Sequence, residues 1–585
     1  MKNIVLYFVF AAVSATFFAS CDDLLDVTPQ SEMTDANFWK SETDFKGACN
    51  QMYYQLSYGS HDSRSDEYVM KSFDVISDGS RSTPATSADD WTDPYKRIFI
   101  ANNIIEKGKA SSLSESVVNR WIAEAYFFRA YEHFNLVCKY GDVPLITKVF
   151  TSVYDADLKM GRTPRETVIQ QCYDDLKFAA TYLPTRAAWT TTDEFDRRRV
   201  TRSSALGLIV RIGLFEGTMQ KYHNLGANWK NHLKEAIDAY DLLKAEGHEL
   251  YKATYTTGIP PFLGQFIEES PANNKEIIFA KAYGPNGGSG SGYTNHSFSG
   301  DSEGTYALSR NVIDLFLYDD GLPREKTNPA NVVSPETSFN DIILHRDPRL
   351  AMTIWTISDP LETHSLIGWL HPNVGKNAFM PFNSQRPQGY QMKKMFIGER
   401  WGASKDYTDR IIIRWGEILL AYAEALYEYN GNITDAQLDE TVNALRERAG
   451  WNVKLTNSLV SANGLDMLTE IRRERSVELM GENVRYTDLI RWKTAETLLP
   501  KALIGAKCVE TADAKDGFLP NCTDATGKLD GEQIVPYPED GIFVVQKSSV
   551  RKFDPEKDYF YPIPVFEIAQ SEGAIKQNKG WLEGN

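Results

Sequence analysis

The sequence has few cysteines, and none of them has a metal-binding or redox spacing. Six cysteines occur in 585 residues, and no pair forms the C-x-x-C pattern that zinc ribbons and thioredoxin-like sites require. The patterns H-E-x-x-H and G-x-x-x-x-G-K-[ST] are absent as well. These absences argue against zinc proteases of that type and P-loop proteins. The sequence predicts neither a metal nor a cofactor.

Positive charge is also scarce. The chain has 63 Lys and Arg against 79 Asp and Glu, which gives a net charge of −16 and a pI near 5.2. Such a chain repels phosphate backbones, so nucleic acid is not an expected partner. Aromatic residues are plentiful, at 12% of the chain. Because sugars stack on aromatic rings and bond to nearby amides and carboxylates, neutral sugars are compatible with this composition.

The chain has one long hydrophobic run, at residues 4–18 directly after Lys2. The run has the length of a signal-peptide core and is short for a transmembrane helix. The tetrapeptide that ends in Cys21 resembles a bacterial lipobox, in which the cysteine is acylated and becomes the mature N-terminus. We expect residues 1–20 to be the signal peptide and residues 21–34 to form a lipid-anchored tether that does not span the membrane. A plain secretory cleavage is the alternative.

Five further cysteines remain after the lipobox, an odd number that cannot pair completely. Cys138 and Cys172 lie in helical patterns, so we expect them to be buried as small hydrophobic side chains. Cys508 and Cys522 flank a polar loop. They are the one plausible disulfide in the sequence.

Residues 123–146 predict a helix that serves as scaffold. Its apolar residues recur at helical spacing, and small alanines alternate with large phenylalanines, so that a neighbouring helix can approach closely. Gly141 permits the left-handed conformation that ends a helix, and Pro144 prevents its resumption. We interpret His133 as a structural residue, because the helix has no convergent set of titratable groups. The apolar stripe consists of Ala123, Phe127, Ala130, Phe134 and Val137.

Other segments show the same helical pattern. Residues 204–217 and 411–431 place alanines where a neighbour must come close, which favours antiparallel helix pairs of the tetratricopeptide type. A helix is also predicted over 470–492, with alternating charges that a solvated face would carry, and another begins near Asp35 as its N-cap. The expected fold is mostly α, with a tetratricopeptide-like scaffold.

The middle of the chain has a different composition. Between residues 253 and 405, clusters of Gly, Pro, Ser and Asn alternate with short apolar runs, among them 276–283 and 351–357. This pattern predicts irregular, loop-rich segments with a few short strands. We therefore divide the mature chain into an N-terminal helical region, 35–250, and a C-terminal region, 251–585, that carries the irregular insertions and further scaffold helices.

Several motifs occur together along nearly the whole chain. Each is weak by itself, but their joint order is specific, and the assembled sequence resembles the RagB/SusD family of Bacteroidetes outer-membrane lipoproteins. The matching segments are the signal with Cys21, followed by 123–146, 273–280, 313–323, 346–350, 388–395, 410–426, 443–450, 469–492 and 559–570.

The resemblance implies a fold and a function. It implies a mostly α fold with four tetratricopeptide-like helix pairs and an irregular second half packed on them. Such proteins are lids of SusC-like TonB-dependent transporters, and they bind glycans, or peptides in some members, without catalysis. Asp22 and Asp23 resemble the acidic signal that sends these lipoproteins to the outer leaflet. A peptide-binding protein of the family and, because two carboxylates suffice, a glycoside hydrolase are the alternatives.

The candidate binding residues are loop aromatics with polar neighbours. Asp78, Arg81 and Trp91 lie in a loop that resembles the family's glycan-contacting region, and Asn102 follows it. The alternative for Trp91 is a core anchor that precedes the next helix. The irregular segments supply four further aromatic candidates, which are Tyr293, Phe298, Trp369 and Trp401.

Overall fold

The structure is a computed structural model of the chain. It describes residues 38–56, 62–70, 73–152, 154–189, 196, 198–253, 259–268, 273–283, 306–337, 339–355, 389–395, 409–507 and 542–582. Some residues singled out in the sequence lie outside the described residues, namely Cys21, Asp22, Asp23, Tyr293, Phe298, Trp369, Trp401, Cys508 and Cys522. The lipidation, the disulfide and the binding roles of these aromatics stay predictions. The division of the chain at residue 250 also stays a prediction.

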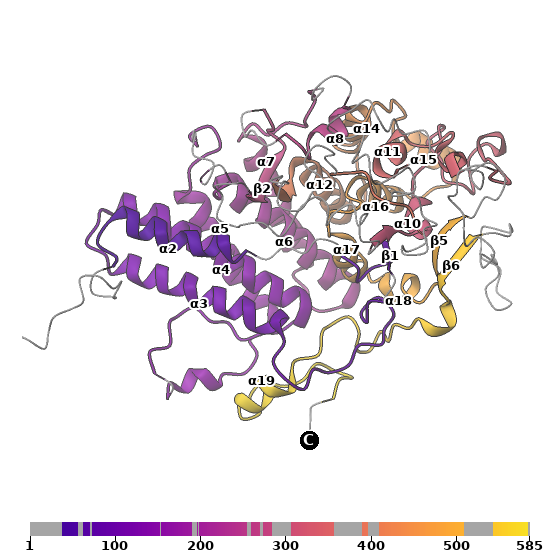
Figure 1. The fold of residues 1–585 in the computed structure, drawn as a ribbon. Helices are drawn as coiled ribbons and strands as arrows, with labels where there is room; N and C mark the ends of the chain where they lie inside the picture. Colours follow the sequence, from indigo (N-terminus) through magenta and orange to yellow (C-terminus); the bar gives the residue numbers. More distant parts are fainter. Residues whose placement is uncertain are drawn as a thin grey trace, which may run out of the picture.

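The N-terminal half is a stack of helices (Figure 1), in which α3 and α4, and α6 and α7, are joined by short connections. α3 packs on α4, α4 on α5, and α6 on α7. These contacts are the helix pairs that the sequence predicts. The helices are α2 (Glu42–Tyr54), α3 (Asp89–Lys109), α4 (Glu115–Tyr140), α5 (Arg165–Tyr182), α6 (Arg202–His223) and α7 (Trp229–Lys244).

Helix α4 shows how these helices pack. Every residue of its predicted apolar stripe is buried. Phe127 meets Phe279 from the other half of the chain edge to face, with ring centroids 5.1 Å apart. The second aromatic face of α4 is buried too, because Tyr126 contacts Phe178 of α5 at 4.5 Å. α4 ends at Gly141, whose φ of +74° is a conformation that glycine adopts without strain.

Helix α2 begins later than the sequence predicts. Its N-cap is Ser41, whose hydroxyl accepts a hydrogen bond from the Asp44 amide, while the Asp44 carboxylate accepts one from the Ser41 amide. This capping box satisfies two amides that have no partner within the helix. Ser41 is therefore the N-cap of this helix, and Asp35, the predicted N-cap, lies outside the described residues.

Residues 410–414 form a strand where the sequence predicts the start of a helix. β4 (Arg410–Arg414) pairs antiparallel with β2 (Ile277–Lys281), which confirms the strand expected at 276–283. Three consecutive isoleucines in β4 favour extended backbone. α12 (Trp415–Asn430) begins only after the strand and ends at Gly431, with a φ of +76°. The predicted helix is therefore wrong at its first turn and confirmed at its end.

The rest of the chain adds short elements. In the apolar run 351–357, the first residues end a helix, α11, Ile354 forms an isolated bridge with Met392, and residues 356–357 lie outside the described residues. The remaining helices are α8 (Pro261–Gly264), α10 (Arg310–Ile313), α11 (Pro348–Thr353), α13 (Asp435–Glu440), α14 (Val442–Arg448), α15 (Asn457–Asn463), α16 (Met467–Glu478), α17 (Arg485–Arg491), α18 (Ala495–Leu498) and α19 (Val565–Gln570), with 3₁₀ turns at Ala156–Lys159, Pro329–Asn331, Phe339–Ile343 and Ser548–Val550. The remaining strands are β1 (Tyr68–Met70), β3 (Tyr306–Leu308), β5 (Leu503–Lys507) and β6 (Ile542–Gln546), where β1 pairs with β3 and β5 with β6.

The predicted helix over 470–492 is two helices. α16 ends at Glu478, and α17 starts at Arg485 after a turn in which Gly481 and Asn483 have φ values of +81° and +63°. The charged residues here are buried, with Glu474 2% and Arg475 4% exposed. The expected solvated face is therefore wrong.

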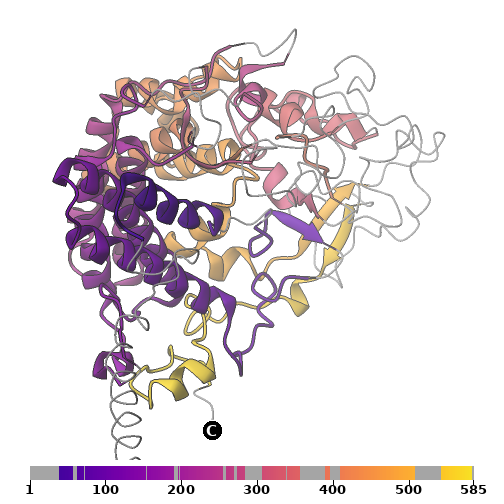
Figure 2. The same cartoon turned by 60° about the vertical axis from the view of Figure 1, so that its left-hand side comes forward.

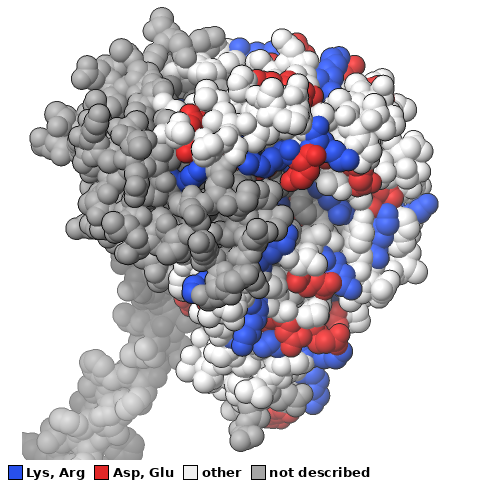
Figure 3. Space-filling model, turned by 90° about the vertical axis from the view of Figure 1, so that its right-hand side faces the viewer, with Lys and Arg blue, Asp and Glu red and all other residues white. Residues whose placement is uncertain are grey.

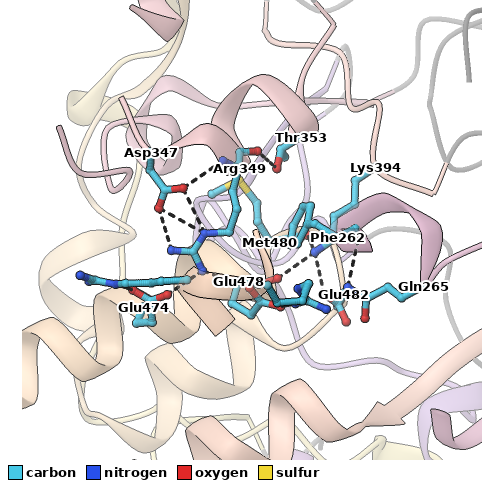
Figure 4. A network of polar contacts seen from close by, with 12 residues as sticks. Phe262, Gln265, Asp347, Arg349, Thr353, Lys394, Glu474, Glu478, Met480 and Glu482 are labelled. Carbon is cyan, nitrogen blue, oxygen red and sulfur yellow. Dashed lines mark hydrogen bonds and ion pairs between the residues drawn. The ribbon is translucent and has the colours of Figure 1, made fainter. Parts of the chain in front are cut away.

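The acidic face of α16 lies in a buried network of charges (Figure 4). Glu478 has no exposed surface and contacts Arg349 at 3.0 Å, Arg414 at 2.9 Å and Arg448. Burial alone would raise the pKa of Glu478, but Arg448, Arg414 and Arg349 outweigh it and hold the pKa at about 2. Nearby, Glu482 pairs with Arg414 and Lys394 at 2.6 Å each. The network joins α11, α14, β4 and α16, so it ties together elements of the C-terminal half.

The C-terminal segment lies against the N-terminal helices, although the two are far apart in sequence. Figures 1 and 2 both show residues 551–582 beside the lower ends of α3 and α4. The Tyr561 amide donates to the Lys139 carbonyl at 2.7 Å, and the Asn578 amide group donates to the Tyr140 carbonyl at 3.0 Å. The segment therefore fixes the region where α4 ends.

The surface seen from the side of β5 and β6 mixes charges of both signs, and no large patch has one sign (Figure 3). None of the helices in the described part of the chain has the length and apolar character needed to cross a membrane.

Candidate functional site

A cleft of about 640 Å³ lies between the helical scaffold and the C-terminal half. α3, α4 and α6 supply residues to one wall and α12, α16 and α17 to the other, and the loop before α3 and Tyr561 also line it. The lining residues include Asp62, Arg64, Asp74, Asp89, Asp90, Asp93, Arg97, Tyr131, Glu132, Phe134, Asn135, Cys138, Lys139, Arg211, Phe215, Glu417, Arg475, Tyr486, Thr487, Asp488, Arg491 and Tyr561.

Acidic residues at the start of α3 form one edge of the cleft. Asp89 and Asp90 occupy the first turn, where carboxylates are stabilised by the helix dipole. Both are exposed, and Asp90 pairs with Lys139 of α4. Asp93 pairs with Lys96 one turn along the same helix, at 2.8 Å. This edge therefore presents negative charge to anything that enters.

The charges deeper in the cleft are paired. Glu132 binds Arg97 at 2.7 Å, and Glu417 binds Arg211 at 2.6 Å. Burial raises the pKa of Glu132, although the Arg97 guanidinium opposes this.

A second cluster of pairs occupies the α16–α17 wall. Asp488 accepts from the Nε atoms of both Arg475 and Arg491, at 2.8 Å each. Arg491 also pairs with Glu424 at 2.6 Å. The inner walls are thus rich in charge but locally neutral.

Two polar atoms that belong to buried residues of the cleft have no hydrogen-bond partner. They are Nη1 of Arg475, a residue 4% exposed, and the hydroxyl of Tyr486, a residue 5% exposed. Burial raises the pKa of Tyr486 well above its ordinary value, so the hydroxyl keeps its proton. Leaving such groups unpaired costs about 1–3 kcal/mol each. Both residues line the cleft, so a ligand or water there can satisfy them.

Aromatic rings lie beside these polar atoms. Phe134 and Phe215 meet edge to face at 5.4 Å, and Tyr131 lies one turn before Phe134 on α4. Burial raises the pKa of Tyr131 to about 12. The Arg64 guanidinium lies 4.6 Å from the centre of the Tyr486 ring, which fixes the orientation of that ring. Rigid rings next to polar groups are what a sugar requires.

The structure brings the predicted loop to the border of this cleft. Arg81 stacks over the ring of Tyr561, a cleft residue, at 4.0 Å and lies 5.1 Å from the ring of Trp581. Asp78 is half-buried, and its carboxylate accepts from the Ser80 amide at 2.9 Å. Neither Arg81 nor Asp78 lines the cleft. Their binding roles stay predictions.

Trp91 and Asn102 lie in the core. Trp91 is 4% exposed and meets Tyr140 edge to face at 4.9 Å, which agrees with the alternative interpretation as a core anchor. Asn102 has no exposed surface, donates to the Ile146 carbonyl at 3.0 Å and accepts from Arg129 at 2.9 Å. This burial contradicts the prediction that either side chain contacts the ligand directly.

Helix α4 contributes more to the site than the sequence predicts. This helix, interpreted as scaffold, also reaches the candidate site, because Tyr131, Glu132 and Asn135 line the cleft. Cys138 lines it as well and is only partly buried, unlike the fully buried Cys172. Because apolar and aromatic residues lie on several sides of α4, its sequence periodicity does not show which side faces the cleft.

His133 is a satisfied structural residue, as expected. Its Nδ1–H donates to the Arg129 carbonyl at 3.0 Å, and its Nε2 accepts from the Ile146 amide at 3.3 Å. Burial lowers its pKa to about 3, so the ring stays neutral.

One cluster of metal-ligand types occurs among the described residues, on α5, α6 and α7. Ligand atoms of Glu166, Glu216 and His232 lie within 4.8 Å of one another. The amide nitrogen of Gln220 already lies between them, at 2.5 Å, 3.1 Å and 3.0 Å, and Glu216 is held by Arg165 at 2.6 Å. The cluster is therefore a closed hydrogen-bonded network, and its residues do not line the cleft.

Comparison with known proteins identifies the family. The SusD family matches residues 275–581, and the description "Starch-binding associating with outer membrane" applies to a second family that matches residues 23–214. The chain belongs to the SusD family.

Its relatives are distant but span the whole chain. SusD-like protein P2 of Formosa agariphila is 23% identical over 96% of this chain and 97% of its own length. A SusD-like protein of Bacteroides ovatus is 22% identical over 96% and 95%. The crystal structure of a SusD-like carbohydrate-binding protein from Bacteroides fragilis has 22% identity and a TM-score of 0.69, over 92% of this chain and 99% of its own. The fold is thus that of SusD-like proteins, a mostly α, tetratricopeptide-like scaffold, as the sequence predicts.

Proposed function

We propose that this protein captures a glycan at the cell surface and passes it unaltered to a SusC-like TonB-dependent transporter. The glycan would occupy the cleft between α4 and α17. Membership of the SusD family supports this role, as does the likeness to a solved structure whose title names a carbohydrate-binding protein.

The observation that carries the proposal is the pair of unsatisfied donors in the cleft. Arg475 Nη1 and the Tyr486 hydroxyl are buried, unpartnered and next to aromatic rings. Each hydrogen bond that one of these donors makes to a sugar hydroxyl would remove a desolvation cost that the free protein carries. The rings of Tyr131 and Phe134 would supply apolar contact for the C–H faces of the sugar.

The arrangement of charges favours binding over catalysis. A glycosidase needs one carboxylic acid to donate a proton and a second carboxylate free to act as nucleophile or base. Here Glu132, Glu417 and Asp488 are each held by at least one arginine at 2.6–2.8 Å. A carboxylate bound in this way is poorly placed to attack a sugar or to activate water, so we propose that the glycan leaves intact.

The location is part of the same proposal. Acylation at Cys21 would anchor the protein in the outer membrane, facing the extracellular side, where a transporter could take over the glycan. The description of the second matching family mentions association with the outer membrane. We expect a Cys21→Ala variant to be exported, but to lose its membrane association and its incorporation of labelled palmitate.

Glycan binding is tested with the mature protein in affinity gels cast with neutral polysaccharides such as amylopectin, xyloglucan, galactomannan and laminarin. Thr487→Trp places a bulky ring in the cleft, and we expect it to lose at least about tenfold in affinity, or 1.4 kcal/mol. Thr497→Trp on the exposed face of α18 is the matched control.

Other outcomes would redirect the proposal. Retardation of the Thr487→Trp variant equal to that of the wild type would place the glycan elsewhere. No retardation by any glycan would favour peptides, and new reducing ends after incubation would favour a hydrolase.

A further inference from the structure

We propose that the cleft selects uncharged glycans and excludes polyanionic ones, with Arg475 Nη1 and the Tyr486 hydroxyl as its sugar-hydroxyl donors. The inference rests on the proposed function and assigns the class of ligand at that site. Most of the charged side chains of the cleft are already engaged in ion pairs within the protein.

Every cation that lines the cleft already has a carboxylate partner. A sulfate or uronate group binds strongly where a guanidinium has a free fork and no competing acid. No lining cation offers that arrangement, since each is paired within 3.0 Å by a carboxylate. The pairs are Arg64 with Asp62, Arg97 with Glu132, Lys139 with Asp90, Arg211 with Glu417, Arg475 with Asp488 and Arg491 with Glu424.

The balance of charge in the cleft is negative. Eight acids and six bases line it, so its formal charge is −2. Asp74 and Asp89 form no ion pair with any described residue. Asp74 instead accepts hydrogen bonds from the Ser63 hydroxyl at 2.7 Å and the Ile76 amide at 2.8 Å. A polyanion would have to approach this surplus against a whole-chain charge of −16.

Arg475 has one nitrogen left over after its ion pairs. Its Nε donates to Asp488 at 2.8 Å, and its Nη2 lies 3.7 Å from Glu417. These acids offset the charge of the guanidinium, while Nη1 keeps an unused N–H. An N–H without surplus positive charge suits a sugar hydroxyl, which needs a donor but no counter-charge.

Tyr486 provides the second donor from α17. Its hydroxyl is unpartnered, and its ring is held between α17 and the Arg64 guanidinium. A phenol donates to and accepts from a sugar hydroxyl equally well. A phenol gives no advantage to an anion over a neutral group, in contrast to a free guanidinium.

The first test compares neutral and anionic polysaccharides on the wild-type mature protein. We expect retardation by at least one of amylopectin, xyloglucan, galactomannan or laminarin, and none by polygalacturonate, alginate, carrageenan or chondroitin sulfate. We also expect affinity for the neutral glycan to be unchanged between low and high salt. Binding of an anionic polymer alone would overturn this inference but leave glycan capture intact, whereas no binding at all would remove both.

The second test removes the donors. Tyr486→Phe deletes only the hydroxyl, and we expect a loss of about tenfold in affinity for the neutral glycan with the melting temperature kept. Tyr154→Phe is the matched control, because Tyr154 is 92% exposed and outside the cleft. Arg475→Lys keeps the charge but loses the fork, and we expect a comparable loss. Unchanged affinity in Tyr486→Phe would contradict the assignment of this donor.

The third test changes the charge at the edge. Asp89→Lys raises the net charge at the exposed edge by two, because a carboxylate is replaced by an ammonium group. We expect this variant to show measurable retardation by polygalacturonate at low salt. Asp241→Lys, on the exposed side of α7, makes the same change in net charge outside the cleft and should not produce it. Equal retardation by both variants would mean that only net charge, and not the cleft, excludes anions.

Discussion

Two charged residues of α16, less than one helical turn apart, are engaged in different ways. Glu478 is surrounded by Arg349, Arg414 and Arg448, and each of its two carboxylate oxygens accepts from at least one arginine. Arg475 pairs with Asp488 but keeps one nitrogen without a partner. Glu478 has no exposed surface and does not line the cleft, whereas Arg475 does.

The difference distinguishes a paired buried charge, which stabilises the fold, from a buried donor that is available to a ligand. A buried charge must be paired, because an unpaired one costs several kcal/mol. The Glu478 network satisfies this requirement and fixes how α11, α14, β4 and α16 pack together. The cleft leaves a donor unsatisfied, which a folded protein tolerates at a site that a ligand or water can fill. We therefore predict a large stability effect at Glu478 and a large binding effect at Arg475.

The largest effect is expected from Glu478→Ala. The change leaves three arginines with a buried charge uncompensated, so we expect the free energy of unfolding to fall by about 3–5 kcal/mol. Denaturant unfolding measures this, with Glu447→Ala at an exposed position of α14 as the matched control. Because the folded pKa of about 2 lies below the ordinary 4.5, the contribution of Glu478 is complete above pH 4.5 and is lost as pH falls through 2. A loss no larger than that of the control would refute the structural role.

Trp91→Ala comes second. Removing a ring that packs on Tyr140 and Tyr95 leaves a cavity, which should cost about 3 kcal/mol in unfolding free energy. Trp91→Phe should cost less and bind the glycan as the wild type does. Lost affinity in a Trp91→Phe protein of unchanged stability would instead make this side chain a ligand contact.

Glu67→Gln gives a smaller effect that depends on pH. Glu67 lies near the end of α16, accepts from the Gly481 amide at 3.0 Å and makes no ion pair with a described residue. Burial raises its pKa to about 8. The folded state then holds a proton that the unfolded state releases above 4.5, so stability is complete below pH 4.5 and is lost as pH rises through 8.

The variant removes this proton linkage, which is worth about 5 kcal/mol at 1.36 kcal/mol per pKa unit, and adds a buried NH₂ group that costs about 1–3 kcal/mol. We therefore expect Glu67→Gln to raise the unfolding free energy at pH 8.5 by about 2 kcal/mol and to give no gain at pH 5. A gain independent of pH would disprove the protonated state.

The smallest stability effect belongs to Tyr486→Phe. Deleting an unpartnered buried hydroxyl removes its desolvation cost, so the unfolding free energy should rise by about 1 kcal/mol, the lower end of that cost, because water in the cleft can meet part of it. Thermal unfolding without glycan measures it. A loss of 2 kcal/mol or more would mean that the hydroxyl has a structural partner in the free protein.

Much of the scaffold is predictable because its signals are local. The stripe of α4 repeats at helical spacing, and Gly141 and Gly431 mark where α4 and α12 end. These features depend on a few neighbouring residues and on backbone sterics. The family match adds the order of the elements along the chain.

The cleft is not predictable in the same way. Charges at 470–491 follow a pattern that an exposed helix would also show, and their partners lie far away in sequence. Arg349 pairs with Glu478, 129 residues later, and Arg211 pairs with Glu417, 206 residues later. Likewise, β4 became a strand because β2 pairs with it, and no local pattern contains that contact. Such partners appear only when the chain has folded.

The most direct test is a crystal structure of the mature protein with an oligosaccharide cut from whichever neutral polysaccharide it binds. We predict that the sugar lies between α4 and α17, with ring hydroxyls within hydrogen-bond distance of Arg475 Nη1 and the Tyr486 hydroxyl. A sugar held on another surface, with those two atoms bonded only to water, would contradict it.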